Sequence, residues 1–175
     1  MTREFRIPAP NLLNAWLLPG VLLLVAAVAG IAQIRSEPGA GAEGLLGIAI
    51  IALGIGWSLR HRSATIEDGR LIVQAGIFST RRPIAEFDLD AARIVNLNDA
   101  PALKPGLKLF GLWLMGYAGG YFWLRDRSTA FVLLTDAARV LVLPDRKGRK
   151  VLLSVEQPQT LLDALRAVAP GRGRR

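Results

Sequence analysis

The chain opens with two long apolar runs, residues 12–34 and 44–59, separated by a polar segment rich in Gly and Pro. Neither run holds a charged residue, whereas surface helices of globular proteins normally keep a polar face. As helices the runs would span roughly 34 Å and 24 Å, against a bilayer core of about 30 Å. The pattern predicts two transmembrane helices in a hairpin, with local thinning of the bilayer around the shorter one.

Basic residues set the expected orientation of this hairpin. Two arginines precede the first run, and Arg60 and Arg62 follow the second. Because positive charge marks the cytoplasmic side, we expect an integral, two-pass protein of a bacterial inner membrane with both termini in the cytoplasm. Trp16 and Trp57 would then lie at the same membrane interface, where indole rings prefer to sit.

The first run has a second interpretation, as a signal peptide cleaved near the Ala-Val-Ala of residues 27–29. The apolar part of a signal peptide is usually only about 7–15 residues, and this run is longer. Ala26 and Gly30 lie four apart, as do Ala52 and Gly56, and small residues at this spacing allow two helices to pack closely. The length of the run argues against cleavage and the small residues favour close packing, so we expect residues 1–62 to form a packed helical hairpin.

From residue 63 the pattern changes to short extended runs punctuated by turns. Asp68-Gly69 suits a tight hairpin, and Pro83 confines its run to a sheet edge or a bulge. Seven or eight such runs predict an antiparallel sandwich or partly open barrel over residues 63–169. An amphipathic helix beginning near Pro158 should cap one open end, and residues 170–175 read as a basic, disordered tail.

One stretch between the strands, residues 107–117, is unusually apolar. It includes Leu112, Trp113 and Leu114, and Lys104 and Lys108 flank it. An exposed apolar patch of this size usually marks an interface. We expect these three residues to contact the membrane or the hairpin, and the lysines to reach headgroups. A strand buried in the domain, or self-association, are the alternatives.

The formal net charge of +8 lies after the second apolar run, and the chain has no cysteine. A basic domain held near an anionic membrane surface is attracted to it by about 1 kcal/mol for each nearby Lys or Arg. The candidate contacts to headgroups or to a partner are Arg60, Arg62, Arg81, Arg82, Lys104 and Lys108.

Residues that carry catalytic chemistry are scarce. His61 is the single histidine and lies between two arginines, where headgroup contact explains it better than general-base catalysis. Metal sites need several His, Cys or clustered carboxylates, and the sequence has neither a nucleophile motif nor a phosphate-binding glycine loop. We expect no catalytic or metal site, no cofactor and no small-molecule substrate, and therefore no enzyme.

Residues 111–124 contain Gly116-Tyr117 and Gly120-Tyr121-Phe122, and a later segment runs Leu153-Ser154-Val155 into Pro158. With these motifs, residues 64–168 resemble a bacterial family of PH-like (pleckstrin homology-like) domains found at the end of small membrane proteins. The resemblance implies two packed antiparallel sheets capped by a C-terminal helix. It does not imply phosphoinositide binding, because the first hairpin turn is acidic here. Met115 stands where the family usually has proline.

Two classes of function follow from the sequence. The first is a membrane-anchored interaction or scaffold module that binds a protein partner or a second copy through a strand edge or the apolar stretch. The alternative is a nonspecific electrostatic binder of anionic lipid headgroups. Nucleic acid is the weaker variant, because the aromatic residues cluster with Leu and Met rather than with the basic residues.

Overall fold

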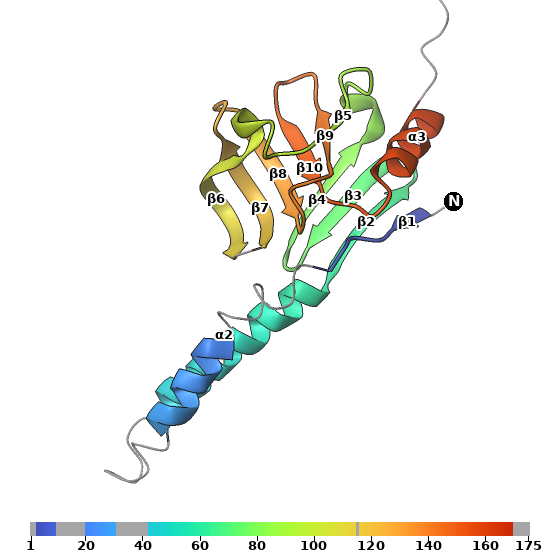
Figure 1. Ribbon diagram of the computed structural model, residues 1–175. Helices are drawn as coiled ribbons and strands as arrows, with labels where there is room; N and C mark the ends of the chain where they lie inside the picture. Colours follow the sequence, from blue (N-terminus) through green and yellow to red (C-terminus); the bar gives the residue numbers. More distant parts are fainter. Residues whose placement is uncertain (1–2, 10–19, 31–41, 115, 170–175) are drawn as a thin grey trace, which may run out of the picture.

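The computed structural model describes residues 3–9, 20–30, 42–114 and 116–169. Two β-sheets form the body, a C-terminal helix lies against it, and a helical stem projects away from it (Figure 1). The fold is mainly β with two sheets, as the sequence pattern predicted. Trp16, which was predicted to lie at the membrane interface, and the basic tail of residues 170–175 lie outside the described residues.

The first sheet is four-stranded and antiparallel, in the order β1-β2-β3-β4. The Asp68-Gly69 turn joins β2 to β3, and both residues have positive φ angles of 48° and 69°, as a tight hairpin requires. β4 ends at Pro83 on the edge of this sheet, which confirms the position expected for a proline-containing strand. The strands are β1 (Arg3–Phe5), β2 (Arg62–Glu67), β3 (Arg70–Ala75) and β4 (Phe78–Pro83).

The second sheet is six-stranded, in the order β5-β9-β10-β8-β7-β6. β10 pairs antiparallel with β9 but parallel with β8, so the expectation of purely antiparallel strands is wrong. The cause is the tight β9–β10 hairpin, which inserts its second strand between β9 and β8. The strands are β5 (Arg93–Val95), β6 (Pro105–Leu114), β7 (Tyr117–Leu124), β8 (Thr129–Leu134), β9 (Val140–Pro144) and β10 (Lys150–Leu153).

The main core lies between the two sheets and is closed by α3 (Pro158–Val168). Pro158 occupies the first turn of this helix, and Leu161 and Leu165 are fully buried at its inner face. Phe131 is the largest fully buried side chain that β8 contributes. The amphipathic spacing read from the sequence therefore predicts the capping helix correctly.

A second, smaller core lies on the outer face of the six-stranded sheet. The connection from β5 to β6 must cross this face, because the two strands lie at opposite edges. The connection includes one short 3-10 helix (Pro101–Leu103). Its residues Leu97 and Leu103 are buried against Phe122 and its neighbours. Both faces of this sheet are therefore largely apolar.

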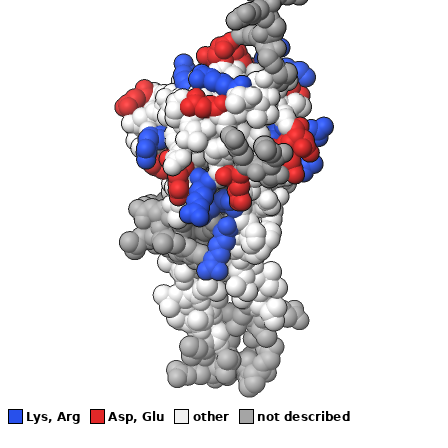
Figure 2. All heavy atoms as spheres, turned by 90° about the vertical axis from the view of Figure 1, so that its right-hand side faces the viewer, with Lys and Arg blue, Asp and Glu red and all other residues white. Residues whose placement is uncertain are grey.

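The stem consists of the helical residues 20–30 and α2 (Ala42–Arg60), which lie side by side (Figures 1 and 2). The small residues Ala26, Gly30, Ala52, Gly56 and Ser58 are buried positions of the stem. α2 leads into β2 through His61, whose Nδ1 lies 3.0 Å from the carbonyl oxygen of Trp57. We call these two helical segments the stem below.

In the described parts of the chain, no helix is both long and apolar enough to cross a membrane. Residues 20–30 rise only about 16 Å, and the uncharged part of α2, residues 44–59, about 24 Å, against a bilayer core of about 30 Å. The predicted two-pass transmembrane hairpin, the integral inner-membrane location and the cytoplasmic placement of both termini are therefore wrong. The prediction rested on the lack of charge in both runs and on local thinning of the bilayer to make up for the short second run.

Candidate functional site

The apolar stretch of residues 107–117 forms most of β6, the edge strand of the six-stranded sheet, and its turn into β7. It is neither a loop nor a buried strand. Phe110 is 68% exposed, Leu107 57% and Trp113 49%, values far above those of the core. Leu112 and Leu114 are partly buried and pack against the main core. β6 is therefore an edge strand with a largely uncovered apolar surface.

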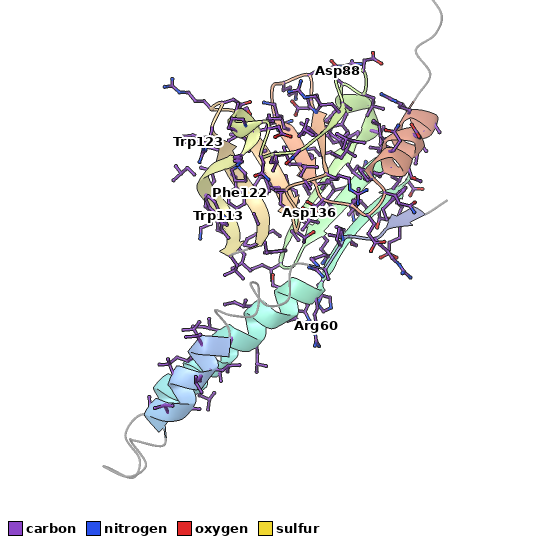
Figure 3. All side chains as sticks on the ribbon, in the orientation of Figure 1. Arg60, Asp88, Trp113, Phe122, Trp123 and Asp136 are labelled. Carbon is purple, nitrogen blue, oxygen red and sulfur yellow. The ribbon has the colours of Figure 1, made fainter. Side chains whose placement is uncertain are left out.

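The inner face of β6 is uncovered because the first sheet does not extend as far. That sheet ends at β4, where the ring of Phe78 packs edge-on against the ring of Phe110, with the ring centroids 5.3 Å apart. Tyr121 on β7 closes the corner, since its hydroxyl donates a hydrogen bond to the Ser79 carbonyl oxygen at 3.4 Å. Beyond this corner Leu107 pairs with Trp123, which is 47% exposed. Trp113 and Trp123 both lie at the end of the body formed by β6 and β7, away from α3 (Figure 3).

Glycines allow β6 and β7 to approach closely and to bend together. Gly111 faces Gly120 across the pair of strands. Gly120 has a φ of +124°, a backbone conformation that residues other than glycine rarely adopt. A Cβ at Gly120 would collide with the backbone of Phe110. The register also shifts between Lys108 and Phe110, which marks a bulge. The glycines noted in the sequence thus shape this edge.

A groove of about 320 Å³ lies on the other side of the same strand pair. Trp113, Leu97 and Leu134 contribute its apolar walls, and Lys104 and Arg125 lie along its lining. The ring of Trp113 packs edge-on against Phe122 at 5.8 Å, which holds the indole at the groove. The volume is at the lower end of the range typical of small-molecule or side-chain pockets.

The structure does not bring the predicted basic residues together. Arg81 and Arg82 lie on β4, Lys104 and Lys108 flank the apolar stretch, and Arg60 and Arg62 lie where α2 joins β2. Figure 2 shows basic and acidic side chains interspersed over the body on the face in view, and Figure 3 places Arg60 beside the stem.

Arg82 is committed to an ion pair that joins the two sheets. Its Nη1 lies 2.7 Å from Oδ2 of Asp145, which follows β9 and whose side chain is almost fully buried. Asp145 also accepts hydrogen bonds from the backbone N–H groups of Lys147 and Arg149 and from Arg149 Nε, each at 2.8 Å. Burial favours a higher pKa, but the hydrogen bonds from Arg149 and Lys147 hold the pKa of Asp145 below its usual value.

The stem carries a second exposed apolar surface. Leu46, Ile50, Leu53 and Trp57 lie on α2 at spacings of three and four residues, and Leu53 is 70% exposed. Such spacing places all four side chains on one face of the helix. Trp57 also stacks on His61, with ring centroids 4.1 Å apart, at the end of α2.

Some of these features could be read from the sequence and some could not. The apolar character of residues 107–114 was evident, but its partners Tyr121 and Trp123 on β7 were missed. Their signal was the alternation in Tyr121-Phe122-Trp123, which puts aromatic rings on both faces of one strand. Among the described residues, no cluster of His, Asp or Glu is arranged to hold a metal ion.

Comparisons with protein families, with curated proteins and with solved structures find no match to this chain.

Proposed function

We propose that this chain is a non-catalytic interaction module that binds an extended apolar polypeptide segment along β6. The observation that carries the proposal is an edge strand whose exposed side chains, Leu107, Phe110 and Trp113, are large and apolar. Natural proteins usually protect such an edge with charges, proline or a covering element. Here Lys108 is the one basic residue within the strand. The resemblance to PH-like domains, a scaffold used for many kinds of binding, agrees with this function but does not by itself support it.

Strand addition explains why both sides of the strand pair are apolar. An added strand forms backbone hydrogen bonds with the edge, and its successive side chains point to opposite faces. One set would cover the surface of Leu107, Phe110 and Trp123, and the other would enter the groove beside Trp113. The expected ligand is therefore a segment with apolar side chains on both faces and few acidic residues near Lys108.

The experiment is selection of peptides from a display library against the full chain, followed by synthesis of the selected sequences. We expect binding to change tryptophan fluorescence and to slow hydrogen exchange of the β6 amides. Phe110→Asp should abolish binding, because it places a charge between Leu107 and Trp113, the other large exposed apolar residues of β6. Leu53→Asp is the matched control, since Leu53 is equally exposed but lies on the stem. Equal loss of binding in the two variants, or no slowing of exchange at β6, would contradict the proposal.

A second candidate function is self-association through the stem, which the exposed row on α2 favours. Burying the remaining surface of about ten half-exposed apolar side chains would contribute on the order of 10 kcal/mol, enough to offset the cost of association. We expect sedimentation to show a discrete oligomer that Leu53→Asp dissociates and Phe110→Asp leaves intact. A monomer at all concentrations would exclude this candidate.

Electrostatic binding to anionic headgroups has weaker support. Arg82, Arg149 and Lys150 are each paired with a carboxylate, and acidic residues interrupt the basic ones on the face shown in Figure 2. This function predicts that sedimentation with anionic vesicles falls steeply as salt is raised, because exposed charges are then screened.

A further inference from the structure

A cluster of polar side chains without partners lies inside the body, at the end where α2 joins the first sheet. Three buried side-chain atoms in the described part of the chain have no hydrogen-bond partner: Nη1 of Arg62, the hydroxyl of Tyr117 and the hydroxyl of Thr135. Buried polar groups are normally hydrogen-bonded, and leaving one unpaired costs roughly 1–3 kcal/mol. Finding all three at one end of the same core calls for a physical reason.

The strand registers place these side chains on the same inner side. Arg62 pairs with Ala75 across β2 and β3, so their side chains share a face. A Cβ at Gly119 would lie 2.5 Å from the hydroxyl of Tyr117 and 3.1 Å from Ala75, so that hydroxyl lies over Gly119, next to Ala75. Gly119 thus leaves room for the phenol to reach the strand that pairs with Arg62.

Thr135 adds a second hydroxyl from the segment that follows β8. It comes directly after Leu134, the last residue of that strand, and it lines the same groove as Tyr117. Ala118 pairs with Leu134, so Tyr117 and Thr135 occupy adjacent positions at the same ends of β7 and β8. β2, β7 and the segment after β8 therefore bring a guanidinium and two hydroxyl groups to the same end of the body.

The electrostatics of the cluster favour a negative charge. No described carboxylate lies within ion-pair distance of Arg62, and burial lowers the pKa of its guanidinium. Burial raises the pKa of Tyr117 to about 12, which the nearby charge of Arg62 only partly opposes. Tyr117 is therefore a neutral donor, as is the hydroxyl of Thr135, and Arg62 adds the uncommitted N–H groups of a charged guanidinium. All three groups are able to donate to the same acceptor.

We propose that Arg62, Tyr117 and Thr135 form a binding site for a phosphate-type oxyanion, either free or as a phosphate ester. Several acceptor oxygens on one anion match donors that come from β2, from β7 and from the segment after β8. Charge-assisted hydrogen bonds from a guanidinium are among the strongest. Arg62 is partly exposed, which gives the anion access from solvent. A buried water would satisfy the hydroxyl groups but would leave the charge of Arg62 unbalanced. Tyr117 and Thr135 also line the groove beside Trp113, so this site adjoins the surface used by the proposed function. Arg62 does not line that groove, so a change at Arg62 tests the anion site by itself.

The test is calorimetric titration of the full chain with inorganic phosphate and, separately, with glycerol 3-phosphate, at constant ionic strength. Saturable binding of either at one site per chain is expected, and the preferred compound distinguishes a free anion from an ester. Arg62→Gln should weaken binding at least about tenfold, or 1.4 kcal/mol. Arg60→Gln is the matched control, because it removes the same charge two residues away on an exposed side chain.

Tyr117→Phe keeps the test decisive if Arg62→Gln fails to fold. It preserves the buried ring and removes only the unpaired hydroxyl, so the variant should fold and bind the anion more weakly. Absence of saturable binding to both compounds, or equal weakening by Arg60→Gln and Arg62→Gln, would overturn the proposal and leave the cluster as a hydrated end of the core.

Discussion

Replacing Asp145 with alanine removes the carboxylate that ties the two sheets together. Asp145 accepts four hydrogen bonds, two from backbone N–H groups and two from the arginines Arg82 and Arg149. The side chain of Arg82 is only 12% exposed, whereas that of Arg149 is 41% exposed. Water can therefore replace the carboxylate at Arg149 but only poorly at Arg82, whose charge would stay buried and unpaired.

The expected loss of unfolding free energy follows from this geometry. Removing one partner of a buried ion pair costs about 3–5 kcal/mol, which exceeds the value of about 1 kcal/mol or less for exposed pairs. Asp145→Asn keeps an acceptor oxygen for the backbone N–H groups of Lys147 and Arg149, so about half of that loss is expected. Urea unfolding followed by circular dichroism measures both values.

Asp163→Ala is the control for this experiment. Its carboxylate is 60% exposed and lies 3.9 Å from Arg166, so its removal should cost less than about 1 kcal/mol. The reasoning is refuted if Asp145→Ala costs no more than Asp163→Ala. Because the folded-state pKa of Asp145 is depressed, its contribution is complete above its unfolded pKa of about 3.9 and is lost as the pH falls through the folded value. The difference between wild type and Asp145→Asn should therefore shrink below about pH 4.

Three further predictions concern the main core, stability at alkaline pH and the edge strand β6. Phe131→Ala should destabilise the protein by about 3–5 kcal/mol in urea unfolding, because it empties a fully buried position. Burial raises the pKa of Tyr117 to about 12, so the free energy of unfolding should fall as the pH rises from 10 to 12, by at most roughly 3 kcal/mol, and Tyr117→Phe should remove this fall. Gly120→Ala should cost about 1–3 kcal/mol and speed hydrogen exchange in β6, since alanine is strained at a φ of +124°.

The sequence predicted the elements that depend on local chemistry. The Asp68-Gly69 hairpin, the edge position of Pro83 and the capping helix from Pro158 all follow from backbone preferences or from a single amphipathic face. The sequence also predicted helices in residues 20–30 and in α2, although the prediction that these helices cross a membrane was wrong. Local patterns report such features because few distant residues contribute to them.

The arrangement of strands could not be predicted, because it depends on distant pairings. Nothing in residues 129–153 indicates that β10 pairs parallel with β8 rather than standing beside β9 alone. The apolar β6 shows the same difficulty: its sequence reads like a buried strand, and only the width of the opposite sheet leaves it exposed. The half-buried Arg62 was likewise grouped with exposed cations, since the sequence gives no sign that it pairs with the buried Ala75 across β2 and β3.

The central position of β10 has a consequence for the order in which the protein assembles. β8 and β9 are neighbours in sequence but are joined in the sheet only through β10, which is the last strand to be synthesised. Without residues 150–153, no strand pairing connects β6, β7 and β8 to β5 and β9, and β8 and β9 would each be an open edge. Open edges pair readily with other chains. The pairing of one four-residue strand, β10, is therefore what makes a single sheet of these two groups of strands.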